Sequence, residues 1–285
     1  MIIMRKIVVL TGCAAVALVL AGTAGAITFG QLDGNAHPNV GALIAEWRTP
    51  GVKQEFCSGT LIAPAIFLTA SHCTKSLQRR GIADHDVWVS FDTDIGDPVD
   101  PSTTNLIQGT MHTNPEFGFA GPGGFSDPHD IAVIVLDVPA ADVYPGITPA
   151  VFPTLGLFDD LAVKNGLRGQ KFTAVGYGVQ EPQPGTGPLF TTFPFDGKRR
   201  RAVSEFDAVH TVWLQLSQRN PTGDGGTCRG DSGGPNFLGA GADETNIIAG
   251  ITDTGDAPCL ATNVIYRMDI PSARDFLAGF GVSLP

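Results

Sequence analysis

The sequence lacks the residue patterns that common metal sites require. No two of its five cysteines are spaced Cys-x-x-Cys, so a structural zinc site is not expected. No tight cluster of aspartates and glutamates has the spacing of an EF-hand loop, so calcium is not expected either. We therefore predict that the protein holds no metal and needs no cofactor.

Basic residues are scarce relative to acidic ones. The chain carries 18 Lys and Arg against 28 Asp and Glu, which gives a formal net charge of −10. An acidic surface repels nucleic acid and anionic membranes. We therefore expect no nucleic-acid partner and no stable membrane association.

The N-terminal segment has the composition of a secretory signal peptide. Arg5 and Lys6 precede an apolar run over residues 7–20, and Ala24-Gly25-Ala26 provides small residues for cleavage. We predict a secreted protein, extracellular or periplasmic, that begins near Ile27. Two alternatives stay open: an uncleaved membrane anchor, and lipid attachment at Cys13, because residues 10–13 resemble a bacterial lipobox.

Sustained helical periodicity is missing until the end of the chain. Short apolar or alternating runs are broken by Gly, Pro, Asp and Asn, which predicts an all-β sandwich or barrel. The expected strands cover residues 39–47, 56–61, 66–70, 87–91, 131–136, 171–175, 209–216, 246–252 and 264–268. Residues 272–278 are predicted to form a closing helix, because Ser272 and Asp275 fit a capping box behind Pro271.

Composition also suggests where the chain divides. The proline-rich segment 144–155 is the expected crossing between an N-terminal half, 27–150, and a C-terminal half, 151–285. Residues 117–128 and 180–188 are rich in Gly and Pro and are expected to be loops. The basic run at 198–201 is expected to be a solvated loop, with an exosite or a self-cleavage site as alternatives.

The richest chemical signal is the glycine-rich segment TCRGDSGGP at residues 227–235. Glycines cost conformational entropy, and here they would expose Ser232 as a nucleophile beside backbone N–H groups. An ordinary surface turn is the alternative. All six histidines precede Ser232, which excludes the α/β-hydrolase order, and Asp33 lacks the strand context of a subtilisin-like order. His72, Asp130 and Ser232 fit the remaining order, with Asp127 second to Asp130.

Three segments together carry a resemblance to a known family. LTASHC at 68–73, HDIAVIVL at 129–136 and GDSGGP at 230–235 resemble the signatures of trypsin-like serine proteases, and the similarity runs from about Ile27 to the C-terminus. The resemblance implies two six-stranded antiparallel β-barrels of the chymotrypsin type with a short C-terminal helix. It places His72 and Asp130 on the first barrel and Ser232 on the second, with a cleft between them.

The chemistry expected of this set is acyl transfer. Ser232 would attack a carbonyl carbon, His72 would take and return the proton, and Asp130 would orient the imidazole. The backbone N–H groups of Gly230 and Ser232 would form the oxyanion hole. We predict a serine endopeptidase that acts on protein or peptide substrates, as a monomer. A non-catalytic protease-like binding or adhesion protein and an esterase are the alternatives.

The resemblance also implies an activation pair and a specificity pocket. A free α-amino group on Ile27 would pair with Asp231, although Thr28 and Phe29 depart from the family's Ile-Val-Gly-Gly start. The pocket would include Gly226 at its base, where trypsins carry an aspartate, so no Arg/Lys preference is expected.

Two further positions belong to the expected pocket. Val264 would narrow it and favour small or medium apolar side chains, and Asp253 stands where the family usually has a serine, as a possible acidic wall.

Four cysteines remain once Cys13 leaves with the signal peptide. An even number in a secreted chain indicates disulfides, and four cysteines allow three pairings. The resemblance implies the pairs Cys57–Cys73 and Cys228–Cys259.

Overall fold

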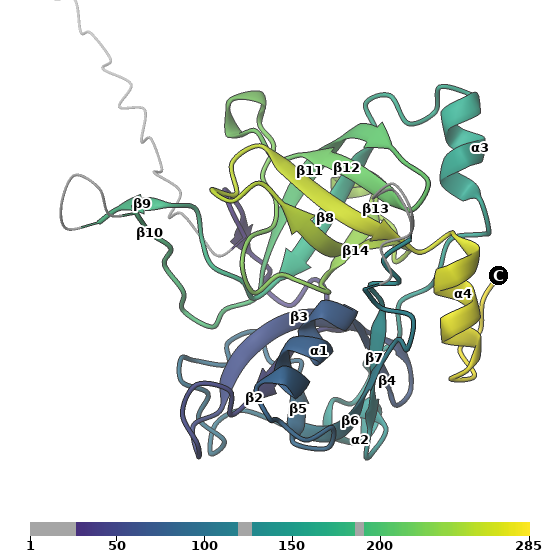
Figure 1. The fold of residues 1–285 in the computed structure, drawn as a ribbon. Coiled ribbons are helices and arrows are strands. Elements are labelled where there is room, and N and C mark those ends of the chain that lie inside the picture. The colour runs from purple at the N-terminus through teal and green to yellow at the C-terminus, as the bar shows by residue number, and fades with distance from the viewer. Residues whose placement is uncertain (1–26, 119–126, 186–190) are drawn as a thin grey trace, which may run out of the picture.

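The computed structural model describes residues 27–118, 127–185 and 191–285, which form two β-barrels flanked by short helices (Figure 1). The expected signal peptide, with Cys13, lies outside the described residues, as do parts of both expected glycine- and proline-rich loops. Among the described residues, no helix combines the length and the apolar character that a membrane crossing requires.

The first barrel is closed and antiparallel. Its strands run in the order β2-β3-β4-β7-β6-β5, and the pairing of β2 with β5 closes it. Side chains such as Leu43, Phe67, Val89 and Ile134 are fully buried inside. The strands are β2 (Val40–Ala45), β3 (Gln54–Ala63), β4 (Ile66–Thr69), β5 (Val87–Ser90), β6 (Ile107–Thr113) and β7 (Ala132–Leu136).

The second barrel has the same closed antiparallel form. Its order is β11-β12-β15-β14-β13-β8, closed by the pairing of β8 with β11. Together the two barrels confirm the predicted all-β fold. The strands are β8 (Lys171–Gly176), β11 (Arg200–Val209), β12 (Trp213–Ser217), β13 (Pro235–Leu238), β14 (Ile248–Gly255) and β15 (Thr262–Arg267), with β9 (Gln183–Pro184) and β10 (Thr191–Thr192) forming a separate ribbon.

The helices are short and only one was expected. The C-terminal helix α4 (Pro271–Ala278) begins one residue earlier than predicted. The N-cap of α4 is Ile270 and not Ser272. The hydroxyl of Ser272 donates to Asp127 rather than capping the helix, so the capping-box interpretation is wrong. Periodicity did not reveal α1 (Ser71–Arg79), α2 (Ala140–Val143), α3 (Leu157–Val163) or two 3-10 turns, η1 (Asn220–Thr222) and η2 (Gly241–Asp243).

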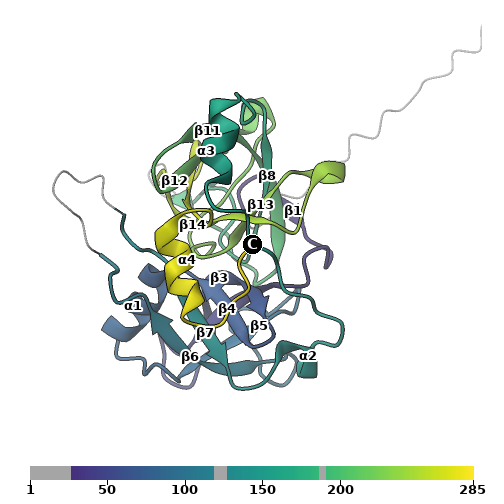
Figure 2. The ribbon, with the colours of Figure 1, turned by 90° about the vertical axis from the view of Figure 1, so that its right-hand side faces the viewer.

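Each barrel is held by a terminal segment that belongs to the other half of the chain. Strand β1 (Gln31–Leu32), which precedes the first barrel, pairs with β11 of the second. Helix α4 follows the second barrel and lies along the side of the molecule where the barrels meet (Figure 2). Phe280, just beyond α4, packs against His112 of β6 with ring centroids 5.3 Å apart.

The basic run at 198–201 is not the solvated loop that composition suggested. Arg200 and Arg201 belong to β11, and the guanidinium of Arg199 is fully buried. Arg199 donates to Asp33 at 3.0 Å and to the carbonyl oxygens of Val40 and Phe91 at 2.8 and 2.9 Å. The loop prediction is wrong because a buried acid more than 160 residues away in sequence neutralises this arginine.

Candidate active site

The glycine-rich serine segment lies between β12 and β13 and is fixed against the first barrel. The backbone N–H of Ser58, on β3, donates to the carbonyl oxygen of Ser232 at 3.0 Å. Gly233 has φ +75°, and a β-carbon there would lie 2.6 Å from the backbone nitrogen of Ala70. Glycine is therefore required for the serine segment to approach the end of β4, directly before α1.

His72 is the second residue of α1 and is bonded twice to one carboxylate. Its backbone N–H donates to Asp130 Oδ1 at 2.7 Å, and its ring Nδ1 lies 2.6 Å from Asp130 Oδ2. Asp130 is buried just before β7, and β7 pairs with β4, which leads into α1. The local topology thus brings the predicted base and its orienting acid together. Asp127, the second choice, instead bonds the hydroxyl of Tyr266 at 2.7 Å.

The pKa values of this pair move in opposite directions. Burial alone would lower the pKa of His72, but the hydrogen bond and the charge of Asp130 raise it. Burial would raise the pKa of Asp130, but its bonds to His72 and the imidazolium charge lower it. Such a pair favours an ionised carboxylate that stabilises a protonated imidazole.

Ser232 and His72 lie in one neighbourhood without a direct bond. The Cys73 sulfur, adjacent to His72 in the chain, lies 3.8 Å from the Ser232 carbonyl oxygen. Within the described chain, the His72 ring and the Ser232 hydroxyl form no hydrogen bond. Catalytic contacts in free enzymes are often longer than in substrate complexes, so this geometry is compatible with proton transfer once substrate binds.

Two backbone N–H groups beside Ser232 are available for an anion. Those of Asp231, Gly233 and Gly234 donate to carbonyl oxygens, whereas those of Gly230 and Ser232 donate to no residue that the structure describes. Gly230 has φ +97°, and its own carbonyl accepts from the Ser58 hydroxyl at 3.0 Å. These features match the requirements of the predicted oxyanion hole.

Asp231 is fully buried and takes its hydrogen bonds from the backbone. Its carboxylate accepts from the N–H groups of Gly178 and Cys228 at 2.8 and 2.9 Å. Burial outweighs these two bonds and raises the pKa of Asp231 to about 7. Ile27 is fully buried as well, and Thr28 forms a β-bridge with Gly226. The start of the described chain is therefore buried against the second barrel.

A cavity of about 300 Å³ opens beside Ser232. Asp253 lines it together with Thr227, Thr252 and Asp256. Gly226 lies against the buried side chain of Gln218, because a β-carbon on Gly226 would come 2.2 Å from Gln218 Oε1.

Of the three residues predicted to form the pocket, Gly226 and Val264 do not line this cavity. Val264 sits on β15, half-buried and paired with Thr254 and Gln215.

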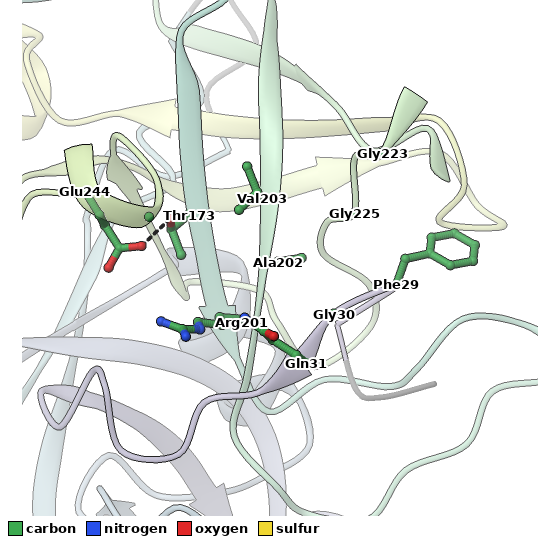
Figure 3. A pocket seen from close by; sticks show the side chains of 11 residues that line it. Phe29, Gly30, Gln31, Thr173, Arg201, Ala202, Val203, Gly223, Gly225 and Glu244 are labelled. Carbon is green, nitrogen blue, oxygen red and sulfur yellow. Dashed lines mark hydrogen bonds between the residues drawn. The ribbon is translucent and has the colours of Figure 1, made fainter. Parts of the chain in front are cut away.

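A second cavity of about 310 Å³ lies away from these residues. Figure 3 shows Phe29 and Gly30 on one side of it and Thr173 with Glu244 on the other, with Arg201 between them. None of His72, Asp130 and Ser232 lines it. It borders the segment that follows Ile27, so it is not the candidate active site.

Asp253, expected as a pocket wall, lines the cavity, and its carboxylate also comes close to the His72–Asp130 pair. Ligand atoms of His72, Asp130 and Asp253 all lie within 4.8 Å of one another, and the Trp213 indole N–H donates to Asp253 Oδ2 at 2.6 Å. These three residues are spaced closely enough to hold a metal ion, but the His72 Nδ1 is already bonded to Asp130. Trp213 and Ser58 carried no signal in the sequence that marked them as part of the site.

Two disulfides brace the site. Cys57 is bonded to Cys73, beside His72, and Cys228 of the serine segment is bonded to Cys259, with both cysteines lining the cavity. Both pairings agree with those implied by the family resemblance.

The comparisons with known proteins agree with this geometry. The family model described as Trypsin matches residues 34–275. The chain belongs to the trypsin family. A protein described as trypsin from Saccharopolyspora erythraea is 29% identical over 228 residues, which cover 77% of this chain and 82% of that protein. The family is one of serine protease hydrolases that act on protein substrates.

A solved structure shares the fold of this trypsin-family chain. The structure titled "Atomic resolution structure of HBP" superposes with a TM-score of 0.60 at 16% identity. The match covers 91% of this chain and 98% of that one.

Proposed function

We propose that this protein is a secreted serine endopeptidase that cleaves peptide bonds through an acyl-enzyme. The observation that carries the proposal is the pair of bonds from His72 to Asp130, next to a serine segment in which two backbone N–H groups have no acceptor among the described residues. His72 would take the proton of Ser232 as its oxygen attacks the peptide carbonyl. The same proton would then go to the leaving amine, and water would release the acyl group.

The N–H groups of Gly230 and Ser232 would bind the oxyanion of the tetrahedral intermediate. Removing one such donor typically lowers kcat by about 10²–10³. No cofactor or metal is required by this scheme. The protein would act as a monomer on a protein or peptide substrate, without nucleic acid.

Activation would follow from signal cleavage itself. Cleavage after Ala26 would free the α-ammonium of Ile27, and Asp231 is a buried carboxyl whose described partners are neutral backbone donors. An ion pair between the two would offset the cost of burying the Asp231 charge. N-terminal sequencing of the active secreted protein should give Ile27, and a start at another residue would refute this step.

The pocket beside Ser232 would show no preference for the basic side chains of Arg or Lys. Its acidic residues are engaged elsewhere, since Asp253 accepts from Trp213 and Asp256 accepts from the N–H groups of Leu260, Ala261 and Thr262. Gly226 adds no charge. A peptide library that shows strong cleavage after Arg or Lys would overturn this prediction.

The decisive test is covalent labelling with a fluorophosphonate probe. The wild-type protein should be labelled at Ser232 and should hydrolyse peptides, whereas the S232A variant should do neither. An S217A variant serves as the matched control, because Ser217 bonds Asp224 outside the site. An unlabelled, folded wild-type protein would favour the binding or adhesion function instead, and ester cleavage without peptide cleavage would favour an esterase.

A further inference from the structure

We propose that Asp253 holds a proton and donates it in a hydrogen bond to Asp130, so that it positions the carboxylate that orients His72. The proposal rests on the proposed peptidase function and deepens it. It makes Asp253 a positioning residue as well as one of the residues that line the cavity beside Ser232.

The backbone of β14 aims Asp253 at Asp130. The register of β14 against β15 shifts between Thr252 and Thr254, so Asp253 is the extra residue of a β-bulge. Bulges beside active sites commonly redirect a side chain that regular alternation would place elsewhere. Here the carboxylate comes within 4.8 Å of a ligand atom of both Asp130 and His72.

Hydrogen-bond donors are distributed unequally between the two acids. Asp130 receives the backbone and ring N–H groups of His72, one on each oxygen. Asp253 receives the neutral indole N–H of Trp213 on Oδ2. Two adjacent carboxyl groups in a buried site do not both ionise readily, and the one with more donors keeps the charge. The proton shared by the two carboxyl groups therefore resides on Asp253. Oδ1 of Asp253, which does not accept from Trp213, is available to carry that proton.

The ionisable groups around Asp253 agree with this assignment. Burial, followed by the charge of Asp130, raises the pKa of Asp253 to about 7, while the Trp213 bond and the charge of His72 oppose that rise. From β15, the neighbouring residues Ile265 and Val264 carry no charge.

One more titratable side chain lies near the pair. The hydroxyl of Tyr266 on β15 is bonded to Asp127 and lies close enough to Asp130 for that charge to affect its pKa. The main influences on the pKa of Asp253 are burial, Asp130, Trp213 and His72 rather than Tyr266 or Asp127.

A pH dependence follows from this arrangement. Below the pKa of Asp253 its proton bridges the two carboxyl groups and Asp130 stays aligned with the imidazole. Above that pKa a second negative charge faces Asp130 and the bridge is lost. Peptidase activity should therefore decline as the pH rises above about 7.

The test compares kcat/KM from about pH 5 to about pH 10 in wild type, D253N and D253V, all measured with EDTA present. D253N keeps a neutral group of the same shape with a donor, so it should stay within about threefold of wild type at the optimum and lack the alkaline decline. D253V cannot donate and should fall about tenfold to a hundredfold. The exposed D243N variant is the matched control and should follow the wild-type profile.

An ionised Asp253 would give a different pH profile. If Asp253 is ionised throughout, D253N removes a negative charge from beside His72 and moves the acid limb of the profile to lower pH. That shift, or a wild-type alkaline limb that survives in D253N, would overturn the proposal.

A second measurement does not depend on catalysis. Infrared difference spectra of S232A at about pH 6 should contain a protonated-carboxyl band that disappears in S232A/D253N and moves with H/D exchange. Absence of that band would refute the protonated state. If wild type neither cleaves peptides nor reacts at Ser232, the peptidase function fails, and the spectra still decide the proton's position.

Discussion

The hydroxyl of Ser58, on the first barrel, donates to the carbonyl oxygen of Gly230, on the second barrel, at 3.0 Å. The same hydroxyl accepts from the backbone N–H of Tyr177 at 3.0 Å. Ser58 is fully buried. One side chain therefore holds the carbonyl of Gly230, the residue whose N–H is available to a developing oxyanion, and it does so from the opposite barrel.

Replacing Ser58 by alanine should impair turnover more than folding. The S58A variant leaves a backbone donor and a carbonyl unpaired, which costs about 1–3 kcal/mol of unfolding free energy. Because Gly230 then loses its anchor, kcat should drop about tenfold, a fraction of what loss of an oxyanion donor costs. Steady-state kinetics and urea denaturation measure the two effects.

The matched control for S58A is S90A. Ser90 is equally buried, and its hydroxyl contacts the Tyr144 hydroxyl and the backbone N–H of Asp92, both within the first half of the chain. S90A should lose stability and keep kcat. If S58A unfolds more readily but turns over like wild type, the anchoring role is wrong.

Alanine at Gly230 should abolish activity for a steric reason beyond its positive φ. Gly230 and Gly223 have similar φ values, +97° and +87°. A β-carbon at Gly230 would lie 2.8 Å from the Gly178 α-carbon, whereas one at Gly223 meets nothing within 4 Å. We expect G223A to cost about 1 kcal/mol and to stay active, and G230A to lose at least about a hundredfold in kcat. Equal activity losses in the two variants would show that strain alone matters.

Glu55 should make the folded protein less stable as the pH rises. Its side chain is buried, and Oε1 contacts no partner in the described part of the chain. Burial, followed by the charges of Asp231 and Asp97, raises the pKa of Glu55 well above its usual value. The folded state thus binds the proton more tightly, and stability present at low pH is lost as pH rises through the folded pKa. E55Q should exceed wild type by about 1–3 kcal/mol at pH 8 and match it near pH 4.

For Glu46 we expect the opposite pH dependence, with stability that is lost as the pH falls. The backbone N–H of Gly51, followed by Lys53, lowers the pKa of Glu46, so its contribution is present at neutral pH and lost on acidification. E46Q should therefore be less stable than wild type at pH 8 and equal to it in acid. Urea titrations of both variants at the two pH values check the signs, and a pH-independent gain in E55Q would contradict the burial argument.

The buried ion pair between Arg199 and Asp33 should be costly to break. R199M removes the buried guanidinium and leaves His37 as the remaining side-chain partner of the Asp33 carboxylate. Removing one partner of a buried ion pair typically costs about 3–5 kcal/mol. The exposed R168M is the control and should unfold like wild type. Thermal unfolding of both variants measures the difference. If R199M and R168M unfold at the same temperature, the ion pair between Arg199 and Asp33 contributes nothing to stability.

Local chemistry and strand patterns could be read from the sequence because they depend on neighbouring residues. The run 131–136 is apolar as a buried strand should be, and the glycines around Ser232 mark a segment that needs unusual backbone angles. The two-barrel topology came from the family resemblance, since alternation alone allowed a sandwich as well.

Features that depend on distant residues could not be read in this way. Helix α1 buries Ser71, Cys73, Thr74 and Leu77, and three of these are polar or small, so no apolar period appears. The bulge at Asp253 breaks the two-residue alternation that would predict its direction. Burial of Arg199 depends on Asp33, a pairing that no single sequence reveals.

Strand β1 and helix α4 give each barrel a segment from the opposite half of the polypeptide. A chimaera that takes only residues 40–136 from a relative would place a foreign β6 against Phe280. One that takes only residues 171–267 would offer a foreign β11 to β1. An exchange of either barrel between relatives must therefore also include the terminal segment that packs against that barrel.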